Sequence, residues 1–311
     1  MTALLLLPLL LPIALPALAR RALGRLAPVA ALWAVTASAA VLAGCSLAAL
    51  GSFVLIGLLK IPLFAAVGQL IHPLRTASDL VVLPAAATSV GALAVCGWTL
   101  VRSVLRQSRA FRAARTQAVR GPSAGDLCVV DSPCPDAYAL PGRPHRIVVT
   151  TAMLRSLDGP EREALFAHER AHNDGHHHYF LVAAELAAHC HPALRPVRET
   201  IRLAAERAAD EAAATRVGDR RLTARAIARA ALAGQAARSA PSGRPDFAPA
   251  ATTGPVPQRV QALLAAPYVP RAGRTIAGLL IACTAVSCVA SAVGMADFHH
   301  RVEVAQGDER P

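Results

Sequence analysis

Charged residues are scarce in this sequence: Asp, Glu, Lys and Arg together make up 17% of its 311 residues. Lys60 is the only lysine, so arginine supplies almost all of the positive charge behind the net +12. Aromatic residues amount to 4%, and no base-stacking or zinc-finger pattern occurs, so we expect no direct nucleic-acid binding. With 54% hydrophobic residues and a mean hydropathy of +0.41, the chain is neither an ordinary soluble globule nor intrinsically disordered.

The apolar residues are gathered in four stretches without Asp, Glu, Lys or Arg. Each is long enough to be tested as a membrane helix, which needs about 20 residues. They predict spans at about 1–19, 28–59, 80–101 and 275–296. The first stretch lacks the positive charge that precedes the apolar part of a signal peptide, so we expect it to be retained. We therefore divide the chain into three spans (1–101), a polar domain (102–270), and a fourth span with a short external tail (271–311).

Arginine placement predicts the orientation, because the cytoplasmic flanks of membrane helices carry an excess of basic residues. Three arginines follow the first span, and six arginines without any acid occupy residues 102–120. Both segments lie on the same side, so we expect a cell-membrane protein with its N-terminus outside and its polar domain in the cytoplasm. Five of the six form one helical stripe, which fits either contact with anionic lipid headgroups or a solvated extension of the third span: Arg102, Arg106, Arg109, Arg112 and Arg115.

Seven cysteines offer no metal or redox framework, because no C-x-x-C pair occurs. Four lie within the predicted spans, and three lie in the predicted cytoplasmic domain, where thiols stay reduced. We interpret all seven as small packing residues.

The cytoplasmic domain reads as a few strands followed by helices. β-rich runs occupy Leu127–Asp131 and Arg146–Thr151. Asp158 and Pro160 supply a cap and a first-turn proline for a helix over 161–172. Further helices are predicted at 179–190, 196–217 and 221–238, and a linker rich in Pro, Gly and Ser at 239–257. The expected fold class is mainly α, with a small sheet beside the helices.

The most specific motif is the H-E-x-x-H pentapeptide formed by residues 168–172. Residues four apart on a helix share a face, so His168 and His172 can bind one metal ion together. Glu169 is displaced by one position and could reach a metal-bound water as a general base without being a ligand. The motif predicts a zinc site with one ion per chain.

A catalytic zinc needs a third protein ligand and an open position for water. Glu206 and Asp210 lie four residues apart on the later helix predicted at 196–217. Glu206 can supply the third ligand, and Asp210 can hold the N–H of a ligand histidine. The alternative is a solvated helix surface on which Glu206 pairs only with Arg202. The run His176–His178 could supply a further metal ligand or an oxyanion donor, but a polar run at a helix junction is usually exposed, and we expect exposure here. His299 and His300 follow the last span and are expected to be interfacial.

A family resemblance follows from these motifs in their order. Three spans, an arginine-rich segment, a strand ending in Val-Val-Thr-Thr, Ala-His-Glu-Arg-Ala-His, a later Glu-Arg-Ala-Ala-Asp-Glu and a closing span resemble the BlaR/MecR-type integral-membrane zinc metallopeptidases. The resemblance implies His168, His172 and Glu206 as zinc ligands, Glu169 as catalytic base and Asp210 as the acid after the ligand glutamate. The antibiotic sensors of that family continue into an extracellular penicillin-binding domain, and we expect this chain to lack it.

The resemblance implies a zinc-dependent endopeptidase that cuts a cytoplasmic protein or peptide, plausibly a transcriptional repressor in signal transduction. We expect the substrate to add as an extra strand beside residues 146–150. One alternative is an HtpX/Ste24-like quality-control or prenyl-protein protease; HtpX-type enzymes often carry an aspartate where this chain has His177. The other alternative is a non-catalytic membrane scaffold. Sequence alone indicates no transition-state stabiliser and no oligomeric state.

Overall fold

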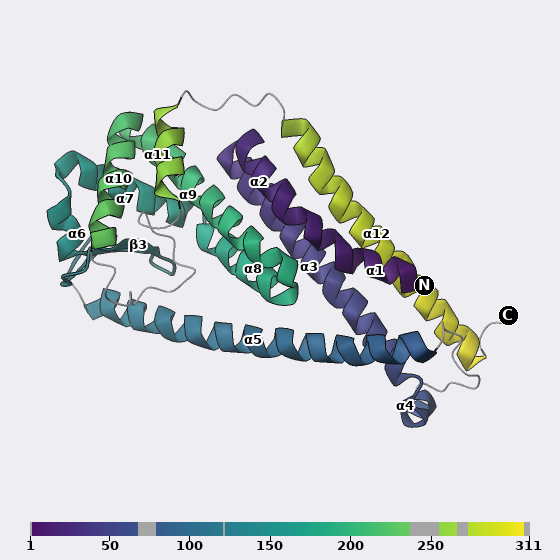
Figure 1. The fold of residues 1–311 in the computed structure, drawn as a ribbon. Helices are drawn as coiled ribbons and strands as arrows, with labels where there is room; N and C mark the ends of the chain where they lie inside the picture. Colours follow the sequence, from purple (N-terminus) through teal and green to yellow (C-terminus); the bar gives the residue numbers. More distant parts are fainter. Residues whose placement is uncertain (1, 68–78, 121, 237–254, 266–272, 308–311) are drawn as a thin grey trace.

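The computed structural model describes residues 2–67, 79–120, 122–236, 255–265 and 273–307 (Figure 1). The chain is mainly helical with one small mixed sheet, as its sequence predicts. Long apolar helices form a bundle at one end, and the sheet with several shorter helices lies at the other (Figure 1). α5 runs along one side of the molecule and connects the two ends (Figure 1).

Four segments are long and apolar enough to cross a membrane: Leu4–Arg25, Pro28–Leu58, Leu80–Val119 and Gly273–Gln306. The first is interrupted, because Pro12 lies in a 3-10 turn, η1 (Leu11–Ala14), between α1 (Thr2–Leu10) and α2 (Leu15–Arg25). The three arginines predicted to form a loop instead lie within α2. α3 (Pro28–Leu58) agrees with its predicted bounds, and the short α4 (Pro62–Val67) follows it.

Two of the four helices are longer than expected. α5 (Asp79–Arg120) continues through the predicted boundary at residue 102, and α12 (Gly273–Gln306) continues past residue 296 into the predicted tail. The arginine stripe is therefore a helical extension of the third span. Arg115 of this stripe donates hydrogen bonds to the carbonyls of Pro141 and Arg143, at 3.3 and 3.0 Å. Arg115 therefore has a structural role, because it binds the loop that contains residues 141–143.

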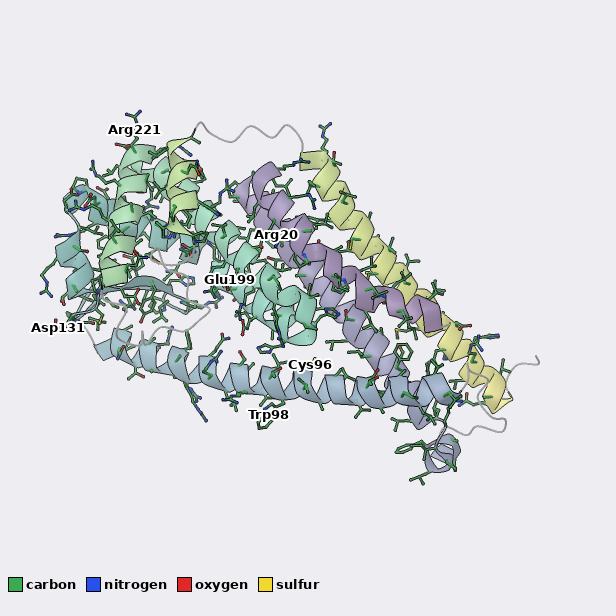
Figure 2. The ribbon with its side chains drawn as sticks, in the orientation of Figure 1. Arg20, Cys96, Trp98, Asp131, Glu199 and Arg221 are labelled. Carbon is green, nitrogen blue, oxygen red and sulfur yellow. The ribbon has the colours of Figure 1, made fainter. Side chains whose placement is uncertain are left out.

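The outer surface of α5 is apolar over the predicted span. Trp98 is 70% exposed and projects away from the neighbouring helices (Figure 2). Val95 and Val101 on the same helix are 60% and 54% exposed. Water would make such a surface unfavourable, whereas lipid chains solvate it. This surface fits association with a membrane.

The sheet has the strand order β1-β2-β4-β3. Its strands are β1 (Ser123–Ala124), β2 (Leu127–Val130), β3 (Ala137–Leu140) and β4 (Arg146–Thr150). β2 and β4 are the two predicted strands and pair in parallel, while β3 pairs antiparallel with the other side of β4. Both edges of β4 are thus occupied, so the expectation that a substrate strand adds beside residues 146–150 is wrong. Within the described residues, β3 is the edge strand on that side.

Helices cover both faces of the sheet. Tyr138 and Val148 pack with Ala114 of α5. Val149 on the opposite face packs against α6 (Thr151–Ser156), α7 (Gly159–Asp174) and α10 (Arg220–Ala236). Successive side chains of a strand point to opposite faces, which explains how Val148 and Val149 enter different cores.

The largest core joins the spans to two helices of the polar domain. Residues of α2, α3 and α12 pack against α8 (His177–Cys190), η2 (Pro192–Leu194) and α9 (Arg195–Val217). Leu32, Phe180, Ile201 and Leu280 are all less than 10% exposed in this core. The predicted linker lies outside the described residues up to position 254, and its last two residues begin an unpredicted helix, α11 (Val256–Leu264). The polar domain is therefore built directly onto the apolar bundle.

Candidate metal centre

The H-E-x-x-H motif lies on α7, whose start is fixed by a reciprocal capping box. The Asp158 side chain accepts from the backbone N–H of Glu161 at 2.9 Å, and the Glu161 side chain accepts from that of Asp158 at 3.1 Å. Glu161 is fully buried and also pairs with Arg225 and Arg229 of α10. The cap sets where the helix begins, and the ion pairs fix it against α10. The motif residues consequently face inward: His168 and Glu169 are 0% exposed and His172 is 1% exposed.

α9 brings Glu206 to the two histidines. The Nε2 atoms of His168 and His172 lie 3.0 Å apart, and Glu206 oxygens lie 3.5 and 3.7 Å from them. One ligand atom from each of the three residues can be chosen so that all lie within 4.8 Å of one another. Glu206 is 0% exposed, so the alternative of a solvated pairing with Arg202 alone is wrong. The structure brings together the three residues predicted as metal ligands.

Asp210 lies one turn beyond Glu206 and contacts the other nitrogen of His168. Its Oδ1 is 2.9 Å from His168 Nδ1, and its side chain is 2% exposed. This is the place that the sequence predicted for it. With Nδ1 directed at a carboxylate, His168 presents Nε2 to the space shared with His172 and Glu206.

Arg259 is a site residue that sequence reasoning missed. It comes from α11, is 0% exposed, and is the only arginine in the buried class among the described residues. Its Nη1 lies 2.9 Å from Glu206, while Nε and Nη2 donate to the two oxygens of Asp210 at 2.8 and 2.6 Å. A weak signal existed in the sequence, because Arg259 is the only charged residue of an otherwise uncharged helix between two proline-containing segments.

His177 is the second residue that the sequence did not place. The expectation that the run 176–178 is exposed is wrong for this member, which is 5% exposed. Its Nδ1 lies 2.8 Å from Nδ1 of His172. His176 is exposed and His178 half-buried, as expected of a polar helix junction. His191 instead accepts from the N–H of Ala193 and contacts the carbonyl of Leu9, in a structural role.

The ionisable groups shift one another strongly. Burial raises the pKa of Glu206, but Arg259 and the histidines outweigh it and hold that pKa well below its ordinary value. Burial also opposes ionisation of Asp210, and Arg259 again lowers its pKa overall. Burial lowers the pKa of His168, yet its hydrogen bonds to Asp210 and Glu206 prevail and raise it to about 9. Burial lowers the pKa of His177 to about 3.

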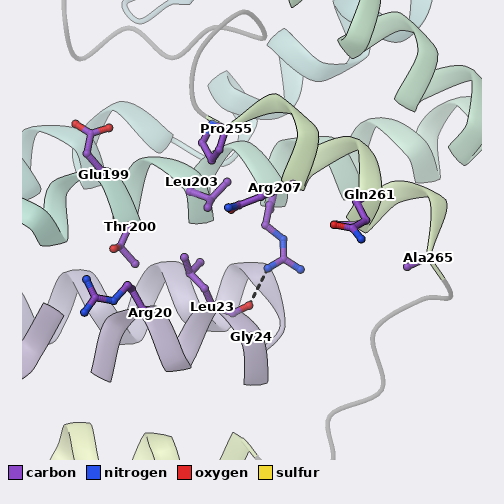
Figure 3. Close-up of a pocket in the computed structure, with 12 residues that line it drawn as sticks. Arg20, Leu23, Gly24, Glu199, Thr200, Leu203, Arg207, Pro255, Gln261 and Ala265 are labelled. Carbon is purple, nitrogen blue, oxygen red and sulfur yellow. Dashed lines mark hydrogen bonds between the residues drawn. The ribbon is translucent and has the colours of Figure 1, made fainter. Parts of the chain in front are cut away.

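A cavity of about 700 Å³ lies near the site but is separate from it (Figure 3). It is bounded by α2, α9 and α11, and none of the three expected ligands lines it. At this cavity Arg207 donates a hydrogen bond to the carbonyl of Leu23 at 2.7 Å, which ties the helix of Glu206 to the first span (Figure 3). The three candidate ligands themselves are buried on α7 and α9, beside Arg259 of α11.

Comparison with known proteins adds one similarity. The profile of peptidase family M48 matches residues 105–195, which run from the second half of α5 to the first residue of α9. The matched range includes the whole H-E-x-x-H motif and ends before Glu206. No curated protein and no solved structure matches the chain significantly. The chain is thus similar to a family of zinc metallopeptidases over the segment that carries the two histidines.

Proposed function

We propose that this protein is a membrane-embedded, zinc-dependent endopeptidase that hydrolyses peptide bonds of a cytoplasmic protein. The observation that carries the proposal is the convergence of His168, His172 and Glu206, with Glu169 buried beside them. The similarity to family M48 and the four apolar helices support the same class of enzyme.

The donor set fits a divalent metal ion. Two imidazole nitrogens and a carboxylate are a common zinc ligand set, and two nitrogens on one tetrahedral zinc lie about 3.3 Å apart, against 3.0 Å between the two Nε2 atoms here. Charge balance gives an independent reason. With His168 and His172 neutral, as metal ligands must be, the buried carboxylates of Glu169, Glu206 and Asp210 face one buried guanidinium, that of Arg259, and leave an excess of two negative charges; without a metal, protonation of His168 offsets one of them. A divalent cation neutralises this excess, and burial without it is costly.

Each residue of the site has a distinct role in the proposed hydrolysis. A zinc ion bound here would polarise the peptide carbonyl and lower the pKa of a water molecule to about 7. Glu169 is placed to accept the proton of the attacking water and to return it to the leaving amine. Asp210 fixes His168, and Arg259 holds the carboxylates of Glu206 and Asp210 in place. Burial of all these groups strengthens their interactions by excluding water.

Topology and substrate access follow from the arginines and the sheet. We place the N-terminus outside the cell and the metal centre at the cytoplasmic side, because the arginines of α2 and of the second half of α5 then share the inner face. We keep the domain limits as a proposal: spans over 1–101 and 271–311 flank a peptidase domain over 102–270, and α5 is common to the first span region and this domain. β3 occupies the side of β4 where we expected a substrate strand, and its four residues are buried, so we propose no strand pairing of the substrate beside residues 146–150.

The specific role is a choice between two kinds of protease. Cleavage of one transcriptional repressor fits the resemblance to BlaR/MecR-type peptidases. An HtpX/Ste24-like quality-control or prenyl-protein protease is the second candidate, and the match to family M48 favours it. A scaffold without catalysis is the remaining alternative.

Two measurements on the full chain test these proposals. Purified protein should contain about one zinc per chain, and His168→Ala should lose it; metal-free wild-type protein would support the scaffold. Cellular peptides from cells with wild-type protein are then compared with those from a Glu169→Gln strain. One cleaved protein identifies a signalling protease, many identify quality control, and no difference contradicts the enzyme.

A further inference from the structure

The turn between α7 and α8 brings a third histidine to the metal centre. α7 ends at Asp174, and α8 begins at His177. Between them His176 adopts a left-handed conformation, with φ 51° and ψ 37°. A residue other than glycine adopts this conformation rarely and at a cost of about 1 kcal/mol. The chain therefore reverses within two residues and directs His177 back toward the last turn of α7.

His177 lies against His172, one of the expected ligands. Its Nδ1 lies 2.8 Å from Nδ1 of His172, and the two rings stand nearly perpendicular, at 84° with centroids 4.8 Å apart. Both rings are buried, at 5% and 1% exposure. This separation is that of a hydrogen bond, in which one imidazole donates and the other accepts according to their tautomers.

The absence of a side chain at Gly175 leaves room for the ring of His177. A Cβ added at Gly175 would lie 2.6 Å from Nε2 of His177 and 3.0 Å from the carbonyl oxygen of Ala171. Since Gly175 has an ordinary negative φ, of −78°, its backbone does not require glycine. The requirement is steric: the imidazole lies directly against this residue. The turn between α7 and α8 therefore determines the position of the His177 ring.

The contact between His177 and His172 resembles the contact between Asp210 and His168. His168 and His172 both present Nε2 toward Glu206, and each has its Nδ1 directed at another side chain. For His168 the partner is the Asp210 carboxylate, and for His172 it is the His177 imidazole. A hydrogen bond at the second nitrogen fixes the tautomer and the ring angle of a ligand histidine, and its loss commonly costs 10- to 100-fold in metal affinity.

We propose that His177 is a positioning residue, which accepts the Nδ1–H of His172 on its own Nδ1 and so fixes the Nε2 of His172 toward the metal. This inference rests on the proposed function, because it takes His172 as a ligand. A neutral imidazole performs this role without adding charge to the site. A carboxylate at the same position would add one negative charge.

The test measures how fast zinc is lost from the full-length protein in detergent after a chelator is added. His177→Asn keeps an acceptor, since Asn Oδ1 occupies nearly the place of His Nδ1, whereas His177→Leu fills the space without one. We expect zinc to leave His177→Leu about 10- to 100-fold faster than wild type, and His177→Asn to restore most of the retention. His178→Ala, one residue away, should match wild type. His177→Ala replaces the leucine variant if that protein does not fold.

Two results overturn the inference. One is zinc retention by His177→Leu equal to that of wild type. The other is loss from His177→Asn as fast as from His177→Leu, which would mean that the ring serves only for packing. Wild-type protein that binds no zinc would instead refute the proposed function. Wild-type protein that binds zinc and releases it in His168→Ala, but not in His177→Leu, refutes only the role of His177.

Discussion

Removing the guanidinium of Arg259 tests the electrostatic basis of the site most directly. Arg259→Met keeps much of the side-chain volume but leaves Glu206 and Asp210 without their buried cation. Breaking a buried ion pair by removing one partner typically costs about 3–5 kcal/mol. For a chain of 311 residues, with an unfolding entropy of about 2.1 cal/mol/K per residue, that lowers the unfolding midpoint by about 5–8 °C. The matched control is Arg221→Met on the exposed surface of α10 (Figure 2), where the change should stay within about 0.5 kcal/mol.

The destabilisation should also depend on pH. Arg259 lowers the pKa values of Glu206 and Asp210 in the folded chain, so their ionised forms add stability above pH about 4 that is lost as the pH falls through the lowered values. In Arg259→Met burial is no longer opposed by the guanidinium, and both pKa values rise. The difference between variant and wild type should therefore be largest near pH 8 and shrink toward pH 4.

Thermal unfolding of the zinc-free chain in detergent, followed at several pH values, measures both effects. A variant that unfolds within 2 °C of wild type at pH 8 would refute the reasoning. A difference that does not change with pH would also contradict it, because it would point to lost packing instead of unneutralised carboxylates. Arg259→Lys should be intermediate, since it restores the charge without the paired hydrogen bonds to Asp210.

Three further outcomes are expected. Glu161→Ala should cost about 1–3 kcal/mol, because it removes the α7 cap and the partner of two arginines, while the exposed Glu163→Ala on the same helix should be nearly neutral in denaturant titration. Asp126→Asn should cost about 0.5–1 kcal/mol near pH 7; since Arg170 lowers the folded pKa of Asp126, the difference should shrink as the pH falls below about 4 and through the lowered pKa, and a pH-independent loss would contradict this. Zinc at 100 times its Kd should stabilise the chelator-treated wild type by about 2.7 kcal/mol and leave Glu206→Ala unchanged; an equal shift in both would place the metal elsewhere.

Features that depend on neighbouring residues were predictable. The helix over 28–59, the cap at Asp158 and the strands at 127 and 146 each arise from local composition or spacing, and the structure agrees with them. The pairing of His168 with His172 belongs to this group, because helix geometry alone puts residues four apart on one face. Helix ends were less accurate: nothing local stops α5 at residue 101, since the following arginines and alanines are good helix formers.

Features that depend on distant segments were not predictable. β3 forms where it does because β4 offers it an edge, and no strong local pattern marks it. Arg259 is 49 residues from Asp210, and a lone arginine on a short helix is usually exposed. His177 follows the motif closely, but its burial depends on a left-handed residue and on the space left by Gly175.

Side-chain chemistry and helical periodicity already indicate which residues can bind a metal and which segments can enter a membrane. The three-dimensional packing is needed to know that Glu206 faces the histidines, that Arg259 neutralises part of the acidic charge, and that His177 contacts His172. These contacts depend on how α7, α8, α9 and α11 pack. That packing is determined by the burial of apolar surface and the pairing of buried charge across the whole chain.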